Sequence, residues 1–416
     1  MAHTAFGPEL RRRREAAGLS LAGLSRLIHY DKGYISKVER GRPPSDRFAR
    51  CCDEALGAGG ELIALARSQP RPRRGRAPQD PRENAPGNGP GTPWADSADA
   101  PDAALVPNAA LLAADGDVYR AYRTVTEALR RLGQRITPAL VFEQVVTHVR
   151  GLERLAVPDD PAGARILLLA AWCAEYAGWM AQEAGDLDAA QRWIAKAARM
   201  AAQAGDRDIP AHSYVRRAEL ALYRHDAEQV IELAARAQAM PGASPRIRAL
   251  AAHREAQGHA LRGDRSRCER ALDRAEGLLA DAGSGTGPLG DLVVGSSTVR
   301  DLGSAIAGWC HHDLGRPERA VDLLEPVVHG IPEWAKRARG RFGARLALAH
   351  LGAGNLDRAC DVGRQVLDLL KYTHSATTLE EVRQLSRELV RWHRHPEARE
   401  LRLALTDALH RAPTAR

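Results

Sequence analysis

The stretch LSLAGLSRLIHYDKGYISKVERG, residues 19–41, predicts two short helices joined by a tight turn. Apolar residues recur in its first half at the spacing of one helical face: Leu21, Leu24, Leu27 and Ile28. Asp31 is a good N-cap for a second helix, and Gly41 is a residue type that ends helices. Ile35 and Val38 give that second helix one apolar face, so its cations and hydroxyls project from the other.

A short amphipathic helix with cations and hydroxyls on its free face has the size and chemistry to enter the major groove of DNA. The segment SLAGLS, from Ser20, and the segment YISKVERG, up to Gly41, resemble the phage-repressor or Xre-type helix-turn-helix. Flanking sequence predicts a first helix over 6–17, a fourth over 48–56 and a fifth over 62–65. The resemblance covers residues 5–67 and implies an all-helical, lambda-repressor-like DNA-binding domain of five helices. The turn position that is usually Gly in that family is His29 here.

The resemblance also implies which side chains touch DNA. Base-edge contacts are implied for the exposed early positions of the second helix: Lys32, Gly33 and Lys37. Contacts to phosphates, which fix register rather than sequence, are expected from six further residues: Tyr34, Ser36, Arg40, Arg42, Arg12 and Arg13. The run Arg11–Arg14 circles nearly a full helical turn, so one or two of its members can face DNA. Ile35, Val38 and Glu39 are predicted to pack or bond within the domain.

The positive charge of the chain is confined to one end. The 416 residues carry a net charge of +8, and residues 1–76 alone hold 16 Lys plus Arg against 8 Asp plus Glu. The remainder is therefore formally neutral. Only five basic residues are Lys, so Arg is favoured throughout, as in actinobacterial-type proteins of GC-rich genomes. Codon bias does not explain the confinement of the surplus, which indicates a basic module on a neutral body.

Cysteine usage and apolar patterning predict a soluble, cytoplasmic protein. The six cysteines are scattered without a CxxC pair, as in reduced intracellular proteins: Cys51, Cys52, Cys173, Cys268, Cys310 and Cys360. The first residues predict a folded, Arg-rich helix rather than a secretion signal. The longest apolar run, over 166–181, is interrupted by Glu175 and too short to span a membrane, so no membrane partner is expected.

No catalytic or cofactor motif emerges from the sequence. Residues 285–290 match GxGxxG, but no strand precedes them and Pro288 lies inside, so we reject a dinucleotide site. The pairs His311–His312 and His393–His395 lack the companions of a zinc site. With no phosphate-binding loop and no nucleophile–base spacing, the chain is predicted to be no enzyme and to bind neither cofactor nor metal.

A Pro/Gly-rich segment follows the basic module. Residues 68–108 contain nine prolines, four glycines and few large apolar residues, so they cannot bury enough surface to offset the entropy of ordering. We predict a flexible linker over 68–112, after a first domain over 1–67. Its basic start, Arg71–Arg76, could lie along a phosphate backbone or in a minor groove, although a solvated linker is the favoured interpretation.

The rest of the chain repeats. Dipeptides typical of a helix end recur at intervals of 38 to 40 residues and once of 52: Gly185-Asp186, His225-Asp226, Gly263-Asp264, Gly315-Arg316 and Gly354-Asn355. Amphipathic helices on both sides predict helical hairpins that stack into an α-solenoid. Small residues before each turn resemble the tetratricopeptide repeat, and a HEAT-like repeat stays open from length alone. We expect a helical pair over 113–160, then repeats and capping helices over 161–416.

The first helices of such hairpins usually line a concave groove. Aromatic, amide, carboxylate and imidazole side chains there suit a peptide or small organic ligand. The candidate groove residues are Trp172, Glu175, Trp179, His212, Glu219, His253, Gln257, Trp309 and Arg341. The 52-residue interval holds a long loop, 281–297, that is expected to cover this groove.

These features together predict a transcriptional regulator that binds double-stranded DNA as a homodimer. Its layout is similar to that of peptide-responsive regulators, with a repeat domain that senses a peptide, small molecule or protein. The alternative is an interaction scaffold, in which the array recruits a partner and the N-terminal domain only localises it to DNA.

Overall fold

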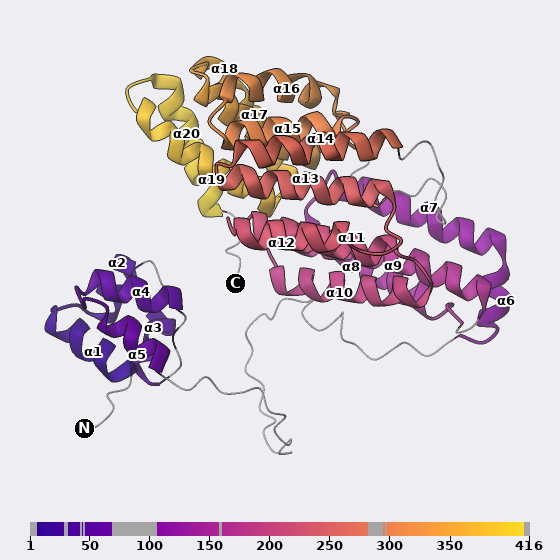
Figure 1. Cartoon of the computed structure of the whole chain (residues 1–416), viewed down its shortest axis with the longest axis horizontal. Helices are drawn as coiled ribbons and strands as arrows, with labels where there is room; N and C mark the ends of the chain where they lie inside the picture. Colours follow the sequence, from indigo (N-terminus) through magenta and orange to yellow (C-terminus); the bar gives the residue numbers. More distant parts are fainter. Residues whose placement is uncertain are drawn as a thin grey trace. The chain divides into compact units, whose positions relative to one another are not determined.

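The computed structural model describes residues 6–28, 32–41, 44, 46–68, 106–157, 160–281, 294–295 and 298–411. The chain divides into two compact units, Met1–Asn88 and Gly89–Arg416 (Figure 1). Every regular element in the described part of the chain is a helix, which confirms the predicted all-α class.

The N-terminal unit contains the five predicted helices. They are α1 (Phe6–Ala16), α2 (Leu21–Ile28), α3 (Lys32–Glu39), α4 (Asp46–Ala55) and α5 (Glu61–Ser68). Their apolar faces meet in one core, in which Phe6, Leu24 and Phe48 are fully buried. Gly18 after α1 and Gly41 after α3 take left-handed backbone conformations, which end the helices where the sequence predicts. The turn residue His29 and the predicted N-cap Asp31 lie outside the described residues.

In the described part of the C-terminal unit, which starts at residue 106, three helices precede the repeats. The predicted pair is present as α7 (Gly116–Gly133) and α8 (Pro138–Glu153). A further helix, α6 (Ala109–Ala114), begins inside the segment 68–112 that composition assigned to the linker. Ala109 and Ala113 are buried, and α6 packs against α7 and the first repeat helix. Six residues of Ala and Leu are too short to show a helical period, so the sequence gives no sign of α6.

Five helical hairpins follow, stacked in chain order (Figure 1). The pairs are α9 (Pro161–Glu183) with α10 (Leu187–Gln203), α11 (Asp208–Leu222) with α12 (Ala227–Gln238), α13 (Pro245–Leu261) with α14 (Arg265–Asp281), α15 (Leu302–Asp313) with α16 (Pro317–Gly330), and α17 (Lys336–Gly352) with α18 (Leu356–Thr373). The predicted C-terminal cap is α19 (Ala376–Glu388), the 3₁₀ helix η1 (Leu389–Trp392) and α20 (Pro396–Arg411). The structure thereby confirms the predicted α-solenoid of helical hairpins.

The five predicted turns share one backbone geometry. In the first, Gly185 has a φ of 86°, and the amide of Asp186 donates to the carbonyl of Ala181. This is a Schellman ending, which satisfies carbonyls that the helix leaves free. The Asp186 side chain then accepts a hydrogen bond from the amide of Ala189 and so starts the next helix. His225 takes the same conformation without being a glycine, with a φ of 54°.

Small residues let the two helices of a hairpin approach closely. A Cβ atom on Gly308 would lie 2.6 Å from Cγ of Leu324 and 3.3 Å from the carbonyl oxygen of Ala320. Gly178 faces Ala190 in the same way in the first hairpin. Gly178 and Ala190, like Gly308 and Ala320, are twelve residues apart in the chain, so this spacing marks direct helix contacts.

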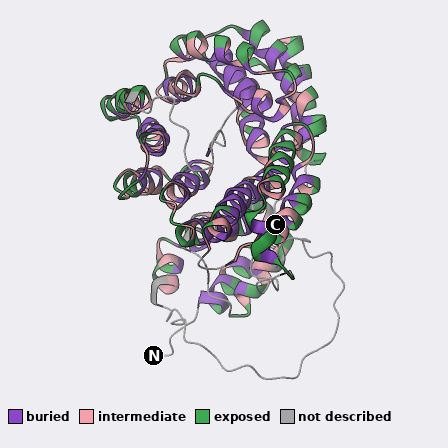
Figure 2. Ribbon diagram, turned by 90° about the vertical axis from the view of Figure 1, so that its right-hand side faces the viewer, coloured by how far each residue is buried: buried purple, intermediate pink, exposed green. Residues whose placement is uncertain are grey.

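Hydrogen bonds and an ion pair join the last hairpin of the array to the first hairpin and to the end of α7. Arg337 at the start of α17 donates to the carbonyls of Gly133 and Ile136, at 2.8 and 2.7 Å, and to Glu183 of α9 at 3.0 Å. Ser375 and Thr377 at the start of α19 donate to the same Glu183 carboxylate. Figure 2 shows the buried faces of the array helices turned toward one another, with exposed residues on the outside.

Candidate functional site

Helix α3 presents cations outward from the N-terminal unit. Ile35 and Val38 are fully buried, as predicted, whereas Lys32, Lys37 and Arg40 are exposed. Two further residues assigned to DNA contact, Tyr34 and Ser36, are half-buried. The Tyr34 ring packs edge-on against that of Phe48, with 5.0 Å between centroids. Gly33 lies within α3, and Arg42 is outside the described residues.

A buried ion pair fixes α3 against α1. Arg14 Nε lies 2.6 Å from Glu39, and Arg14 Nη1 donates to the carbonyl of Leu19 at 2.8 Å. Arg14 is 7% exposed. The predicted bonding role of Glu39 within the domain is confirmed, and its partner identifies Arg14 as structural.

The α1 cations assigned to phosphate contact have an acidic partner that the sequence interpretation missed. Arg12 binds Glu9 through two nitrogens, at 2.8 and 2.6 Å, and Arg13 lies 2.7 Å from the same carboxylate. The hydrogen bond from Arg12, with that from Arg13, lowers the pKa of Glu9 to about 2. Arg13 also pairs with Glu61 and is the less exposed of the two, at 19% against 64%. Spacings of three and four residues from Glu9 were the available signal.

Comparison with known proteins bears on this unit alone. Residues 5–66 match the family model of a helix-turn-helix domain. This match confirms the helix-turn-helix predicted for residues 5–67 and supports a DNA-binding regulator. No curated protein and no solved structure matches the chain. The Xre-type and tetratricopeptide resemblances stay predictions.

The array contains a pocket of about 380 Å³. Six of the predicted groove residues line it: Trp172, Glu175, Trp179, His212, Glu219 and Arg341. The other three, His253, Gln257 and Trp309, are buried on the same set of helices but do not line it. Trp309 is covered because the guanidinium groups of Arg345 and Arg341 lie 3.7 and 5.4 Å from its ring centroid.

Several lining residues were absent from the prediction. Arg130, Arg131 and Gln134 come from α7 and its end, which the sequence placed before the array rather than around its groove. Arg216 and Arg254 also line the pocket. The signal for Arg216 was available, because it lies four residues after His212, on the same helical face. The α7 residues lie at the pocket because Arg337 of α17 binds the end of α7, a set of contacts that we call the closure. Nothing near Arg337 in the sequence indicates these contacts.

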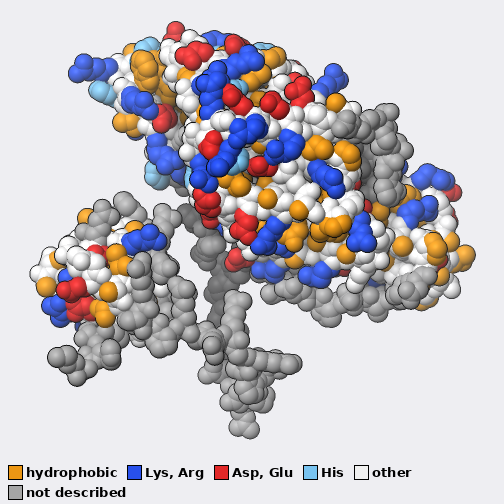
Figure 3. All heavy atoms as spheres, in the orientation of Figure 1, with side chains coloured by type: hydrophobic (Ala, Val, Ile, Leu, Met, Phe, Trp, Pro, Cys, Tyr) orange, Lys and Arg blue, Asp and Glu red, His pale blue; other side chains and the backbone are white. Residues whose placement is uncertain are grey.

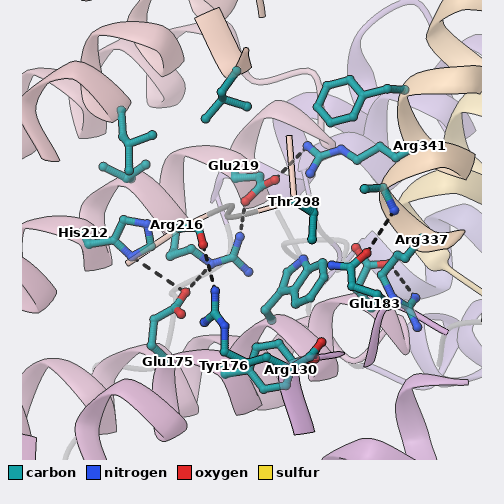
Figure 4. Close-up of a pocket in the computed structure, with 18 of the residues that line it drawn as sticks. Arg130, Glu175, Tyr176, Glu183, His212, Arg216, Glu219, Thr298, Arg337 and Arg341 are labelled. Atoms are coloured by element: carbon teal, nitrogen blue, oxygen red, sulfur yellow. Dashed lines mark hydrogen bonds and ion pairs between the residues drawn. The ribbon is translucent and has the colours of Figure 1, made fainter. Parts of the chain in front are cut away.

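Glu219 lies among arginine side chains in the pocket (Figure 4). Its carboxylate lies 2.8 Å from Arg341 and 3.5 Å from Arg254, and it also pairs with Arg216. Burial raises the pKa of Glu219, but these three positive charges outweigh burial and hold the pKa below its usual range. One carboxylate therefore faces three guanidinium groups.

Burial shifts the pKa values of two neighbouring titratable groups toward their neutral forms. Burial raises the pKa of Glu175, although Arg216 lies 3.3 Å away. Burial and the charge of Arg216 lower the pKa of His212 to about 3, so its imidazole is neutral at pH 7. A site that already holds several cations disfavours a further proton.

Part of the long loop forms a wall of the pocket. Gly295 and Thr298 line it, and Arg130 donates to the carbonyl of Gly295 at 2.9 Å. Gly295 has a φ of 90°, and a Cβ atom there would lie 3.1 Å from Leu250. Residues 282–293 and 296–297, which include the rejected GxGxxG match, lie outside the described residues.

Outside the pocket, the array surface carries mixed charge. On the face shown in Figure 3, Lys and Arg side chains lie among Asp and Glu. Within the described ranges, no three His, Cys, Asp or Glu side chains are grouped so that they could hold a metal ion. No helix in that part of the chain is long and apolar enough to cross a membrane.

Proposed function

We propose that this chain is a cytoplasmic, sequence-specific transcriptional regulator and not an enzyme. Its α3 helix reads DNA, and its array binds an effector and mediates dimerisation. The observation that carries the proposal is the match of residues 5–66 to a helix-turn-helix domain. The array pocket, built from charged and aromatic side chains of α7, α9, α11, α13 and α17, supports the sensing role.

Lys32 and Lys37 are the proposed base-reading side chains. Both are exposed on α3, and a lysine can donate to guanine O6 or N7. Gly33 offers only its backbone at the third position. Phosphates would compete with Glu9 for Arg12 and Arg13. Arg12 is the more exposed of the two, so it is the stronger candidate for a phosphate contact.

A pair of these domains is needed for typical specific affinity. One helix-turn-helix makes few base contacts, and dimers of such domains bind half-sites about 34–36 Å apart, one helical turn of DNA. We therefore propose a homodimer that binds an inverted repeat.

Gel-shift titration with the full chain tests the DNA-binding proposal. The probe is DNA from the promoter region of the protein's own gene. The Lys32→Ala/Lys37→Ala variant loses two base contacts, each worth about 1–3 kcal/mol, so its affinity should fall by about 30-fold or more. The matched control is Arg236→Ala/Arg265→Ala, which removes two cations, each 58% exposed, from the array. Unchanged binding by the lysine variant, with helicity intact, would disprove the proposal.

One observation favours the scaffold alternative. Val390, Trp392 and Leu403 are large apolar residues near the C-terminal end, and they are 53%, 38% and 55% exposed. Such residues suit a protein partner. Co-purification followed by mass spectrometry separates the two functions, because a scaffold retains a stoichiometric protein and a small-molecule sensor does not.

A further inference from the structure

The pocket carries more positive than negative charge. Among the described residues that line it there are six arginines and four glutamates. Glu183 is already bound by Arg337, Ser375 and Thr377. Glu219 is shared by three arginines, so the positive charge next to it is not neutralised. An uncompensated buried charge is costly, and a ligand of opposite sign removes that cost.

Three hydrogen-bond donors at this pocket are buried without an acceptor. Nε of Arg254, Nε of Arg341 and the indole Nε1 of Trp172 have no hydrogen-bond partner among the residues that the structure describes. All three residues line the pocket, and Trp172 is only 2% exposed. Each of these N–H groups can only donate. Native proteins leave few buried donors unpaired, so the part of the wall around Arg254, Arg341 and Trp172 has too few acceptors for its donors.

Flat apolar surfaces lie beside these donors. Trp172, Tyr176 and Trp179 recur at one face of α9, and all three line the pocket. The guanidinium of Arg130 lies 4.3 Å from the ring centroid of Trp172. Trp334 also lines the pocket, from the segment before α17. Aromatic walls with arginine stacking suit a planar ring.

The dimensions of the pocket favour a small molecule over an extended peptide. A volume of about 380 Å³ falls near the lower end of the usual range for small-molecule sites, roughly 300–1,000 Å³. Arg337 also joins α17 to α9 and to the end of α7, which closes the face along which a peptide would lie.

We propose that the effector is a small organic anion with a planar ring, held by Arg254 and Arg341 with its ring against the half-buried aromatic side chains of the pocket, Trp179 and Trp334. This inference rests on the proposed sensing function of the array and names the chemical class of its ligand. Carboxylates and phosphates share the required chemistry, because both offer several acceptor oxygens to guanidinium groups.

Displacement of a fluorescent anion from the full chain tests the inference. The probe is 1-anilinonaphthalene-8-sulfonate, which is expected to bind with a stoichiometry of one per chain. The competitors are 2-naphthoate, 2-naphthyl phosphate and the neutral 2-naphthamide. At least one anion should compete about ten-fold better than the amide, or more, and the better anion distinguishes a carboxylate ligand from a phosphate.

Variants assign this binding to the pocket. Arg254→Gln leaves Glu219 with Arg216 and Arg341, so the fold should persist while probe affinity falls about ten-fold or more. Arg130→Gln is the second variant, because it removes a cation that α7 contributes to the pocket. Arg236→Gln, on the exposed face of α12, should bind as the wild type does. Equal competition by amide and anions, or wild-type affinity in both pocket variants, overturns the inference.

Gel shifts on the same preparation keep the two proposals apart. If DNA binding fails while the anion preference and its loss in the variants are observed, the regulator proposal fails and the anion site stands. If DNA binding succeeds while the amide competes equally, the inference about the ligand alone fails.

Discussion

Replacing Arg337 with alanine should open the array at the joint between its ends. Arg337 is 1% exposed, and its guanidinium donates to the carbonyl of Gly133 at the end of α7, to that of Ile136 just after it, and to Glu183. The bond to Glu183 connects residues 154 positions apart in the chain. Removal of this one side chain therefore tests whether the closure is a stabilising interaction or only a proximity of two surfaces.

The structure sets the expected magnitude. Removing one partner of a buried ion pair costs about 3–5 kcal/mol, because the remaining charge stays buried. Glu183 keeps the hydroxyls of Ser375 and Thr377, while the two carbonyls lose their donor. We therefore expect the free energy of unfolding to fall by about 3–5 kcal/mol. The control Arg236→Ala breaks an exposed pair with Glu232 and should cost about 0–1 kcal/mol.

Urea unfolding of the full chain, followed by tryptophan fluorescence, measures this difference. Hydrogen exchange should also become faster at residues 133–136 and at the start of α19, where the closure is made. The double variant Arg337→Ala/Glu183→Ala should cost less than the sum of the two single variants, since neither buried charge is then left alone. An Arg337 variant as stable as the control, or strict additivity in the double variant, refutes the reasoning.

Three further predictions concern packing, the α1–α3 contact and pH. Gly308→Ala should lower the free energy of unfolding of the array by about 1–3 kcal/mol, because its Cβ would lie 2.6 Å from a neighbouring side chain. Gly277→Ala should raise that free energy by about 0.5–1 kcal/mol, because no atom lies within 4 Å of its Cβ. Urea midpoints compare the two variants. Arg14→Ala leaves Glu39 without its cation, so the N-terminal helices should unfold in a transition separate from that of the array. Thermal unfolding followed by circular dichroism measures this, and a single unchanged transition would contradict it. Burial lowers the pKa of His253 to about 4, so stability should decline as pH falls from about 6.5 toward 4, and His253→Gln should flatten that decline in urea midpoints.

The features that the sequence predicts well are those with a local cause. The end of α3 at Gly41 and four of the five array turns follow from glycines in left-handed conformations, and His225 takes that conformation in the remaining turn. The twelve-residue spacing of Gly308 and Ala320 is also local, because one hairpin contains both. Periodicity and turn chemistry of this kind decide the helices before any tertiary contact is known.

The features that the sequence does not predict depend on contacts across the array. Nothing near Arg337 indicates that it will meet Gly133, and nothing near Arg130 places it over Trp172. The register of the groove was predictable, and six of nine residues meet at one pocket. Trp309 does not line the pocket, because Arg341 and Arg345 stack on its ring. These contacts depend on tertiary packing and have no local signal in the sequence.

The contacts of Arg337 and the pocket share one helix, so the proposed ligand would be linked to the arrangement of the array helices. Arg337 and Arg341 lie four residues apart and therefore on one face of α17. Arg337 fastens this helix to α9 and α7, while Arg341 reaches Glu219 on α11. An anion bound between Arg341 and Arg254 adds contacts that exist only when α17 is held against the other helices. Such a ligand binds the closed array more tightly than an open one, and that difference in affinity is what a ligand needs to shift a conformational equilibrium.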